Sequence, residues 1–306
     1  MAIATSLQAD LPVWAGAIPL ISPNCADLAK PTIELKRFSD GESYVRLGRV
    51  ERLKGHDAVI LHRLYPDPDQ SLVALLQMIY GAKEHGAENV HLILPYLPYS
   101  RADKILLSGE ILSAKMLVKL LHISGASDLV TWDCHFLKGL GVHEFEHLKI
   151  HNLCAVPDLV KGLGSIEPRP LLVGPDEGAR YLAGKEGYFI HKKRGAYESD
   201  PSHASRPVIH MQADFDVAGR SVVLVDDLIA SGDTMIKAAQ KMKEMGAISV
   251  SAAATHGLFL HHAQDRMKEA GISRILTSDT IPNPASVPVI RSRIEHLLHA
   301  TGNHVS

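Results

Sequence analysis

The stretch from Val222 to Met235, which reads VVLVDDLIASGDTM, constrains the fold of this chain more than any other. Four apolar residues, three of them β-branched, lead into the acidic pair Asp226 and Asp227. This pattern is typical of a buried parallel strand at the point where it leaves its sheet. A short polar loop follows, and the apolar spacing after it predicts a helix that ends at Gly246. The stretch therefore predicts a strand, a loop and a helix.

The loop between this strand and this helix has the features of a phosphate-binding site. Backbone N–H groups in the first turn of a helix lack intrahelical partners and lie at the positive end of the helix dipole. The hydroxyls of Ser231 and Thr234 add two donors. The acidic pair would repel a phosphate unless it binds another part of the ligand, such as a sugar diol or a hydrated Mg²⁺. The loop therefore favours a phosphorylated sugar, although acids also end strands in α/β domains that bind nothing.

Composition narrows the class of protein. A length of 306 residues favours two domains, and a net charge of -2 gives no basic surface for nucleic acid. We expect no membrane span, because the chain has no run of about 18 apolar residues, and no signal peptide, because its N-terminus lacks a basic segment. The three cysteines, at positions 25, 134 and 154, lack the spacing of a disulfide framework, which favours the cytoplasm.

Apolar strands alternate with amphipathic helices along most of the chain. We expect strands within residues 56–63, 89–104, 128–136, 170–184, 187–195, 249–259 and 274–282, and helices within 71–87, 111–126 and 290–300. This alternation predicts an α/β fold with two similar domains, each a mostly parallel sheet flanked by helices, with ligands at the carboxyl ends of the strands. A break in periodicity around residues 149–156 places the domain boundary, so we expect domains at 1–152 and 153–306.

Charged side chains follow several of these strands. Arg101 and Lys104 could bind phosphate oxygens, while Asp133 and His135 could orient a metal-bound nucleotide. The basic run 192–194 leads into a polar segment that we expect to be a mobile loop, able to close over a polyphosphate. Each of these motifs can equally be a solvated loop or a structural residue, and spacing alone does not decide.

Two levels of resemblance to known families add to this interpretation. VVLVDDLIASGDT resembles the phosphoribosyl-diphosphate (PRPP) binding motif shared by type I phosphoribosyltransferases and PRPP synthases. Beyond that motif, the chain is similar to ribose-phosphate diphosphokinase (PRPP synthase) over nearly its whole length. The matching segments are FSDGE at 38–42, LPYLPYSRADK at 94–104, SAK at 113–115, TWDCH at 131–135, GPDEG at 174–178, IHKKR at 190–194 and THGLF at 255–259.

The resemblance implies an enzyme that transfers the β,γ-diphosphoryl group of Mg-ATP to the C1 hydroxyl of ribose 5-phosphate, giving PRPP and AMP. It implies an ATP site, a ribose 5-phosphate site and Mg²⁺, in a homo-oligomer built from dimers whose adenine site lies at a subunit interface. The residues it assigns to ATP are Phe38, Asp40 and Glu42 for adenine and Arg101 and His135 for the phosphates and their metal.

The same resemblance assigns the remaining roles. His135 and Asp176 are expected to bind the metal, and Lys192, Arg194 and His135 are expected to be catalytic. The residues expected to bind ribose 5-phosphate are Asp226 and Asp227 through the hydroxyls, and Ala230, Ser231, Gly232, Asp233 and Thr234 through the 5-phosphate.

Some residues depart from the pattern of the best-known class of that family. Ala230 stands where that class has Asp, and Ala102 stands where a Gln usually follows the phosphate-binding Arg. Asp233 adds a negative charge beside the expected phosphate site, so we expect its side chain to face outward. Two other functions remain open: a type I phosphoribosyltransferase, which needs no ATP site, and a non-catalytic regulatory homologue, which would be expected to lose the loop cations or the ribose acids.

Overall fold

The structure is a computed structural model that describes residues 11–137, 139–166, 169–184, 187–194, 208–299 and 301, with backbone alone at 192–194 and 208–210. The chain divides into two compact units. The N-terminal unit holds the described residues of Thr5–Leu153 and of Pro288–Ser306, and the C-terminal unit spans Cys154–Val287.

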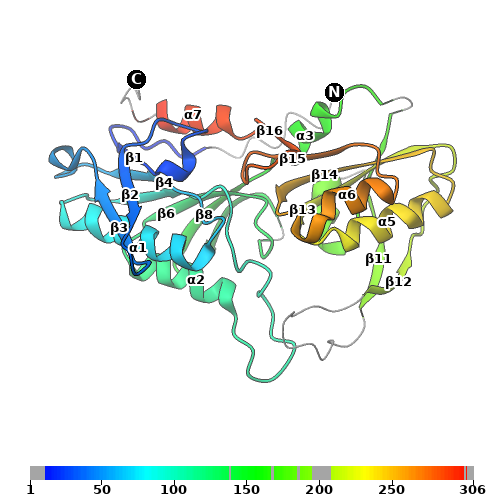
Figure 1. The fold of residues 1–306 in the computed structure, drawn as a ribbon, viewed down its shortest axis with the longest axis horizontal. Helices are drawn as coiled ribbons and strands as arrows, with labels where there is room; N and C mark the ends of the chain where they lie inside the picture. Colours follow the sequence, from blue (N-terminus) through cyan, green and yellow to red (C-terminus); the bar gives the residue numbers. More distant parts are fainter. Residues whose placement is uncertain are drawn as a thin grey trace. The chain divides into compact units, whose positions relative to one another are not determined.

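A six-stranded sheet forms the centre of the N-terminal unit, in the order β1-β4-β5-β6-β8-β7 (Figure 1). The first five of these strands are parallel, and β7 pairs antiparallel with β8 at the edge. Their bounds are β1 Ile18–Ile21, β4 Ala58–Leu61, β5 Val90–Ile93, β6 Asp128–Trp132, β7 Gly141–Phe145 and β8 Leu148–Leu153. The run AVIL of β4 is entirely apolar and β5 is apolar except for His91, and every residue of both strands is buried, as suits strands that are covered on both faces.

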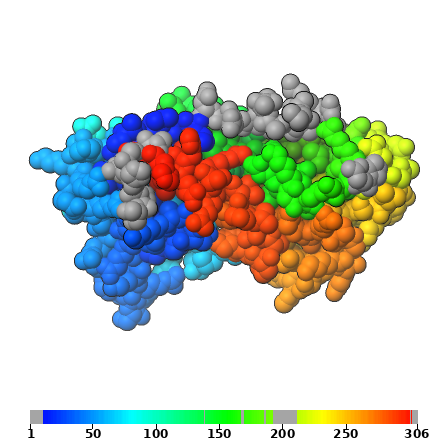
Figure 2. Space-filling model, turned by 90° about the horizontal axis from the view of Figure 1, so that it is seen from above, coloured from blue at the N-terminus to red at the C-terminus, as the bar shows by residue number. Residues whose placement is uncertain are grey.

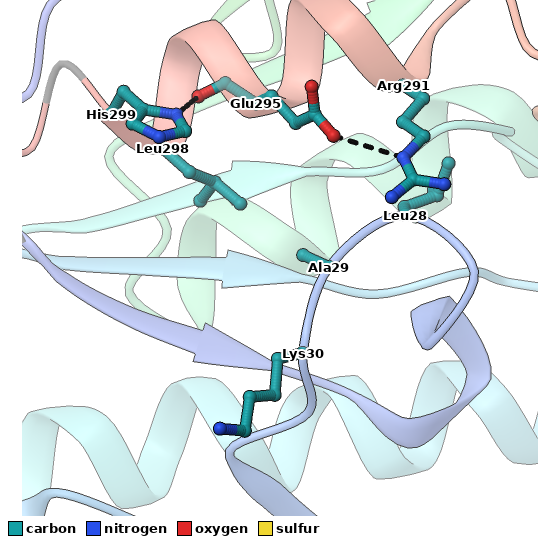
Figure 3. Close-up of a pocket in the computed structure, with 7 residues that line it drawn as sticks. All are labelled: Leu28, Ala29, Lys30, Arg291, Glu295, Leu298 and His299. Carbon is teal, nitrogen blue, oxygen red and sulfur yellow. Dashed lines mark hydrogen bonds and ion pairs between the residues drawn. The ribbon is translucent and has the colours of Figure 1, made fainter. Parts of the chain in front are cut away.

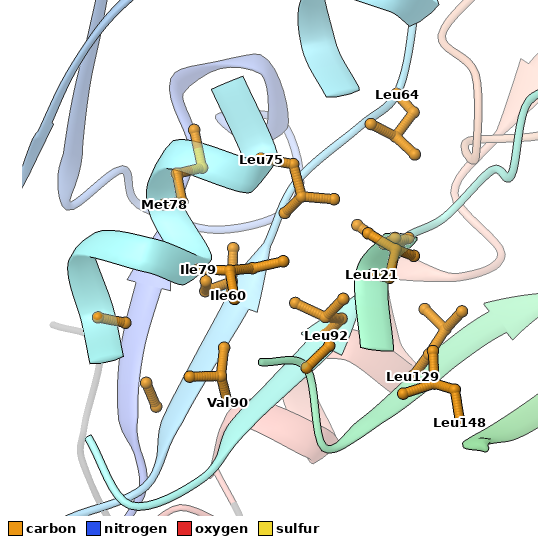
Figure 4. Packing of buried hydrophobic residues seen from close by; sticks show 14 of the residues in the cluster. Ile60, Leu64, Leu75, Met78, Ile79, Val90, Leu92, Leu121, Leu129 and Leu148 are labelled. Carbon is orange, nitrogen blue, oxygen red and sulfur yellow. The ribbon is translucent and has the colours of Figure 1, made fainter. Parts of the chain in front are cut away.

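Helices α1 (Pro68–Glu84) and α2 (Ser113–Ile123) contribute to the main core of this unit (Figure 4). Apolar residues of α1 recur at helical spacing, so that Leu75 and Ile79 point toward Ile60 and Leu92 of the sheet. A separate antiparallel hairpin, β2 (Ile33–Arg37) and β3 (Ser43–Leu47), packs against α1. Two short 3-10 helices, Pro23–Cys25 and Val50–Arg52, also belong to this unit.

The last described helix, α7 (Arg291–His299), returns to the N-terminal unit. Its buried side chains are Ile294, Leu297 and Leu298. Just beyond it, the carbonyl of Thr301 accepts a hydrogen bond of 2.8 Å from the N–H of Gly16. In Figure 2 the red of this helix lies beside the blue of the first described residues.

The C-terminal unit contains a second six-stranded sheet, entirely parallel, in the order β10-β9-β13-β14-β15-β16. Its strands are β9 Leu171–Gly174, β10 Tyr188–Phe189, β13 Ser221–Ile229, β14 Ser249–Gly257, β15 Ile275–Ser278 and β16 Ser286–Val287. A two-stranded antiparallel sheet pairs β11 (His191–Arg194) with β12 (Val208–Gln212). The helices are α3 Val156–Gly162, α4 Arg180–Ala183, α5 Asp233–Glu244 and α6 Ala263–Glu269, with 3-10 helices η3 at Glu177–Ala179 and η4 at Leu260–His262.

The predicted fold class is confirmed, because both units are mostly parallel sheets flanked by helices. The two units do not follow the predicted division at 152/153 throughout, since α7 belongs to the N-terminal unit. The break in periodicity that suggested the boundary is itself part of β8, where His151 and Asn152 are polar but buried. None of the described helices is long and apolar enough to cross a membrane.

Candidate functional site

The acidic pair Asp226 and Asp227 lies near the carboxyl end of β13, in the middle of the C-terminal sheet. The strand does not end at the acids, as the sequence pattern predicted, because β14 pairs with it as far as Ile229, opposite Gly257. On the other side, β9 pairs with β13 only as far as Leu224. The acids therefore lie just past the end of one neighbouring strand, where a ligand can approach the sheet edge.

The two carboxylates differ in exposure. Asp226 is half-buried and accepts a hydrogen bond of 3.0 Å from the backbone N–H of Asp227, whose own side chain is buried. A carboxylate that accepts a backbone N–H is held in a fixed orientation, since the donor belongs to the strand itself. Asp226 thus presents an oriented acceptor at this end of β13, with the buried carboxylate of Asp227 next to it in the strand.

Residues 230–234 form the predicted phosphate loop and lead directly into α5. Gly232 precedes the helix in the left-handed conformation, with φ +77°, and the first described intrahelical bond joins the N–H of Ile236 to the carbonyl of Gly232 at 2.9 Å. The N–H groups of Asp233, Thr234 and Met235 precede that bond, so they have no intrahelical acceptor. The predicted strand, loop and helix are present, with backbone donors at the start of α5.

Helix α6 packs closely beneath this loop. A Cβ added to Gly232 would lie 3.2 Å from the Cβ of Ala263 and 3.2 Å from Met267, so a side chain there would push these neighbours back by a few tenths of an ångström. Glycine is thus favoured at position 232 both by the positive φ and by the close approach of α6. In Figure 1, α5 and α6 lie side by side.

Asp233 faces outward, as expected, but it is not isolated. Its carboxylate accepts a hydrogen bond of 2.8 Å from the hydroxyl of Ser231 and forms an ion pair with Arg266 of α6. Partial burial raises the pKa of the Asp233 carboxyl, but the hydrogen bonds from Ser231 and Arg266 and the positive charge of Arg266 outweigh it, and the net pKa is lowered. No sequence motif pointed to Arg266, which is 33 residues away from Asp233 along the chain.

Asp176 shares the sheet edge with the acidic pair. It follows β9, the parallel neighbour of β13, and it is half-buried at the start of η3. A Cβ on Gly174 would lie 3.1 Å from the Asp176 carbonyl oxygen, and one on Gly178 would lie 3.1 Å from its carboxylate. The glycines of GPDEG therefore let the turn close tightly around Asp176.

The remaining predicted residues of this unit are Lys192 and Arg194, and both lie in β11. The register pairs Lys192 with Met211 of β12 and shifts between Lys193 and Arg194, which is a local irregularity of the ladder. Only their backbone is described. The expected mobile loop at 194–206 lies outside the described residues from position 195 onward.

In the N-terminal unit, the predicted adenine-binding residues form the turn of the β2–β3 hairpin. Phe38 is 54% exposed and meets Tyr44 edge-on, with 5.7 Å between ring centroids. The N–H of Phe38 bonds the carbonyl of Glu42 at 2.9 Å, and the N–H of Glu42 bonds the carboxylate of Asp40 at 3.1 Å. An exposed aromatic ring on a well-ordered turn is available to stack on a planar ligand.

Two further predicted ATP-binding residues follow neighbouring strands of the N-terminal sheet. Arg101 lies exposed on the loop after β5, beyond Tyr99, which has a positive φ of 61°. His135 lies exposed just after β6, in a turn where the N–H of Cys134 bonds the Asn152 side chain at 2.9 Å. Because β5 and β6 are adjacent and parallel, the loops that carry Arg101 and His135 leave the same edge of the sheet.

The N-terminal end of α1 connects two of these segments. Its side chains contact both the hairpin turn near Phe38 and the loop that leads to Arg101. The contacts are Gln70 to the carbonyl of Gly41 at 3.0 Å, Asp67 to Arg37 at 3.0 Å, and Asp69 to the hydroxyl of Tyr99.

A pocket in the N-terminal unit contains none of the predicted site residues (Figure 3). It lies between α7 and the segment at Leu28, and an ion pair of 3.0 Å between Arg291 and Glu295 lies on its wall. Nor do the described residues contain a group of three or more His, Cys, Asp or Glu side chains that could hold a metal ion. The two predicted metal ligands belong to different units, His135 to the N-terminal one and Asp176 to the C-terminal one.

Comparison with known proteins gives the family. Residues 24–125 match the N-terminal domain of ribose phosphate pyrophosphokinase, and residues 192–294 match the phosphoribosyl synthetase-associated domain. A ribose-phosphate pyrophosphokinase from Sulfolobus acidocaldarius is 34% identical over 261 residues, covering 83% of this chain and 86% of the relative. The chain belongs to the ribose-phosphate pyrophosphokinase family. A second ribose-phosphate pyrophosphokinase, from Methanopyrus kandleri, is 34% identical over 271 residues, which cover 87% of this chain and 90% of that relative.

A solved member of the ribose-phosphate pyrophosphokinase family has the same fold. The crystal structure of phosphoribosylpyrophosphate synthetase from Mycobacterium smegmatis matches with a TM-score of 0.72 and 26% identity, covering 93% of this chain and 99% of that one. The family expected from FSDGE, SRADK, IHKKR and the PRPP loop is therefore confirmed. The matched segments include the hairpin turn, Arg101, Lys192, Arg194 and the whole phosphate loop.

Proposed function

We propose that this protein is a ribose-phosphate diphosphokinase, which transfers the β,γ-diphosphoryl group of ATP to the C1 hydroxyl of ribose 5-phosphate. The C1 oxygen attacks the β-phosphorus, the bond from that phosphorus to the α,β-bridging oxygen breaks, and the C1 hydroxyl loses its proton. The products are PRPP and AMP. Family membership supports the reaction class, and the residues below support the roles.

The observation that carries the proposal is the combination of an acidic pair and a helix N-terminus at one end of β13. Asp226 and Asp227 offer acceptors for the ribose hydroxyls, while the free N–H groups at the start of α5 offer donors for the 5-phosphate. A ligand that satisfies both must carry hydroxyls and a phosphate a few ångströms apart, as ribose 5-phosphate does. Residues 230–234 thereby form the phosphate end of the site.

The N-terminal unit supplies the residues that we assign to ATP. The exposed ring of Phe38 suits stacking on adenine, and the carboxylates of Asp40 and Glu42 can accept hydrogen bonds from its amino group. Arg101 can bind phosphate oxygens with its two parallel N–H donors. We further propose that the hairpin turn serves a site at a subunit interface, in a homo-oligomer built from dimers.

Magnesium fits this site as an ion held mainly by the substrate. Mg²⁺ prefers oxygen ligands and keeps several waters, so a protein needs to add only one or two ligands to those of a polyphosphate. The half-buried carboxylate of Asp176 suits that role, and we assign orientation of the nucleotide to the exposed imidazole of His135. The bound ion would neutralise charge on the phosphate oxygens.

We assign catalysis to positioning and electrostatics, with no covalent intermediate on the protein. Lys192 and Arg194, on β11, are the cations that we expect to stabilise negative charge as the diphosphoryl group transfers. His135 is the remaining proposed catalytic residue. The acids and the phosphate loop hold the sugar so that its C1 hydroxyl is oriented for attack.

We place this reaction in the cytoplasm. The three cysteines of the chain, Cys25, Cys134 and Cys154, are all free and buried, which suits a reducing compartment. Burial raises the pKa of the Cys25 thiol to about 12, so that thiol is unreactive at neutral pH.

The deciding experiment is incubation of the purified chain with Mg-ATP and ribose 5-phosphate, followed by phosphorus NMR. We expect the resonances of PRPP and AMP to grow together, and none to grow when ribose replaces ribose 5-phosphate. Asp227→Asn serves as the site control, with a large loss of turnover expected. Formation of ADP, or consumption of added PRPP with a nucleobase, would contradict the proposal and favour a different transferase.

A further inference from the structure

One face of α6 contacts the phosphate loop through three residues. Ala263, Arg266 and Met267 are spaced by three and four positions, so they share that face. Ala263 and Met267 lie against Gly232, while Arg266 pairs with the carboxylate of Asp233 and directs a second guanidinium N–H to the carbonyl of Ser231 at 3.4 Å. The helix therefore supports the loop by packing and by charge together.

The carboxylate of Asp233 creates an electrostatic problem at this position. It is the first residue of α5, so its negative charge lies at the same helix N-terminus that would bind a phosphate. A carboxylate there competes with a phosphate for the helix dipole and repels it. The lowered pKa of Asp233 keeps the carboxylate ionised at neutral pH, so the repulsion is not relieved by protonation.

Arg266 is placed to relieve that repulsion. Its side chain is 42% exposed, and its guanidinium pairs with Asp233 of α5. Ion pairing cancels the charge of Asp233 and fixes the side chain on the α6 side of the loop, where Ser231 also donates to it. With the pair formed, the negative charge of Asp233 is offset, and the backbone donors at the start of α5 remain available to a phosphate.

We infer that Arg266 is a positioning residue for ribose 5-phosphate, acting as the counter-charge of Asp233 rather than as a ligand of the phosphate. This inference rests on the proposed function for the identity of the ligand. It explains how this chain keeps an acid in its phosphate loop, and it assigns a role to a residue outside all of the sequence motifs.

The test is calorimetric binding of ribose 5-phosphate to the full chain without ATP, for single and double variants. Arg266→Met removes the charge and keeps the apolar stem, and we expect it to weaken binding about tenfold. Asp233→Asn should bind at least as tightly as the unmodified chain. The double variant Asp233→Asn with Arg266→Met should return to within about threefold of the unmodified chain, because both charges are then gone.

Two further variants separate charge from structure. Lys268→Met is the control: it removes another cation of α6, one that pairs with Asp265 at 4.0 Å and not with Asp233. This variant should leave ribose 5-phosphate binding unchanged. Arg266→Lys keeps the charge and should retain binding within about threefold. The loss in Arg266→Met should also shrink as salt rises from about 0.05 to 0.5 M, since salt screens exposed charges.

The outcomes are distinct. If the unmodified chain binds no ribose 5-phosphate, the proposed function itself fails. If it binds and Arg266→Met binds equally well, Arg266 has no role. If the double variant keeps the full tenfold loss, Arg266 contacts the phosphate directly or acts only through packing, and the counter-charge inference is wrong. Should Arg266→Met fail to fold, unaltered binding by Arg266→Lys together with tighter binding by Asp233→Asn would support the inference, and weak binding by Arg266→Lys would overturn it.

Discussion

The side chain of Gln70, in the first turn of α1, donates a hydrogen bond of 3.0 Å to the carbonyl oxygen of Gly41, at the tip of the β2–β3 hairpin. One residue earlier, Asp69 accepts a hydrogen bond from Tyr99, two positions before Arg101. The start of α1 thus contacts both segments to which we assign ATP binding. A change at this turn should therefore affect the nucleotide and not the sugar.

Gln70→Ala tests that connection. Loss of one hydrogen bond to the hairpin should let the Phe38 turn move, and we expect the KM for ATP to rise about threefold to tenfold, with the KM for ribose 5-phosphate unchanged. Steady-state kinetics with each substrate varied in turn measures the effect. Gln77→Ala, an exposed position on the same helix, is the matched control. Equal changes in both KM values would argue against a specific role in nucleotide binding.

Gly232→Ala probes the close approach of α6 to the phosphate loop. The substitution meets an unfavourable φ of +77° and a Cβ contact of 3.2 Å, so we expect a loss of about 1–3 kcal/mol in the free energy of unfolding and weaker binding of ribose 5-phosphate. Denaturant unfolding measures the first and calorimetry the second.

Gly219→Ala is the control for backbone strain alone. Gly219 also has a positive φ, +66°, but nothing lies within 4 Å of an added Cβ. The Gly219→Ala variant should lose about 1 kcal/mol in free energy of unfolding and should bind ribose 5-phosphate as the unmodified chain does. If both variants behaved alike, packing against α6 would contribute nothing.

A charge cluster far along the chain from the phosphate loop predicts a pH dependence of stability. His91 lies between two carboxylates, with Nδ1 2.9 Å from Asp128 and Nε2 3.3 Å from Asp57, and its ring stacks on Trp14 at 4.8 Å between centroids. Burial lowers the pKa of the His91 imidazole, but the hydrogen bonds and charges of Asp128 and Asp57 outweigh it, and the net pKa is raised. The folded state therefore favours the protonated imidazole.

A raised pKa stabilises the folded state at pH values below the unfolded pKa of about 6.5, and the stabilisation is lost as pH rises through the folded pKa. At pH 6 the free energy of unfolding of the unmodified chain should be higher than that of the His91→Gln variant by roughly 1–3 kcal/mol. At pH 9 the difference should be smaller. Denaturant titrations at the two pH values measure the difference. His85→Gln, an exposed position, should show no such trend; an equal difference at both pH values would mean that charge plays no part.

Lys192→Ala tests the proposed catalytic role of β11. If Lys192 acts on the transition state, kcat should fall by about 10²-fold or more, while the Kd for ribose 5-phosphate stays nearly unchanged. Rapid-quench measurement of AMP formation gives the first and calorimetry the second. A parallel loss of binding and turnover would instead make Lys192 a ligand of the ground state.

The sequence was sufficient for features that are encoded locally. The run VVLVDD and the helix after it have the predicted form because apolar β-branched residues and a helical apolar face suit only those elements at those positions. The point at which β13 ends was not predictable from its own residues, because the strand continues through Asp226 to Ile229 by pairing with β14. Strand length is decided by a partner distant in sequence.

Strand β8 was not predicted from the sequence, because it contains buried polar residues. His151 and Asn152 broke the apolar pattern of β8, although both side chains are buried, and Asn152 bonds the N–H of Cys134 at 2.9 Å and the carbonyl of Gly139 at 2.7 Å. Nor could the sequence reveal Arg266, because the ion pair with Asp233 exists only once α6 packs against the loop. Both features arise from tertiary contacts.

The return of α7 to the first sheet has a consequence for how the molecule is made. Residues 288–301 complete a unit that was begun before residue 154, so that unit cannot finish folding on the ribosome until the entire C-terminal sheet has been synthesised. A fragment cut after Leu153 would expose the surface that Ile294, Leu297 and Leu298 cover. The order of synthesis and the order of assembly therefore differ, because a segment made after the C-terminal sheet closes the unit that was begun before it.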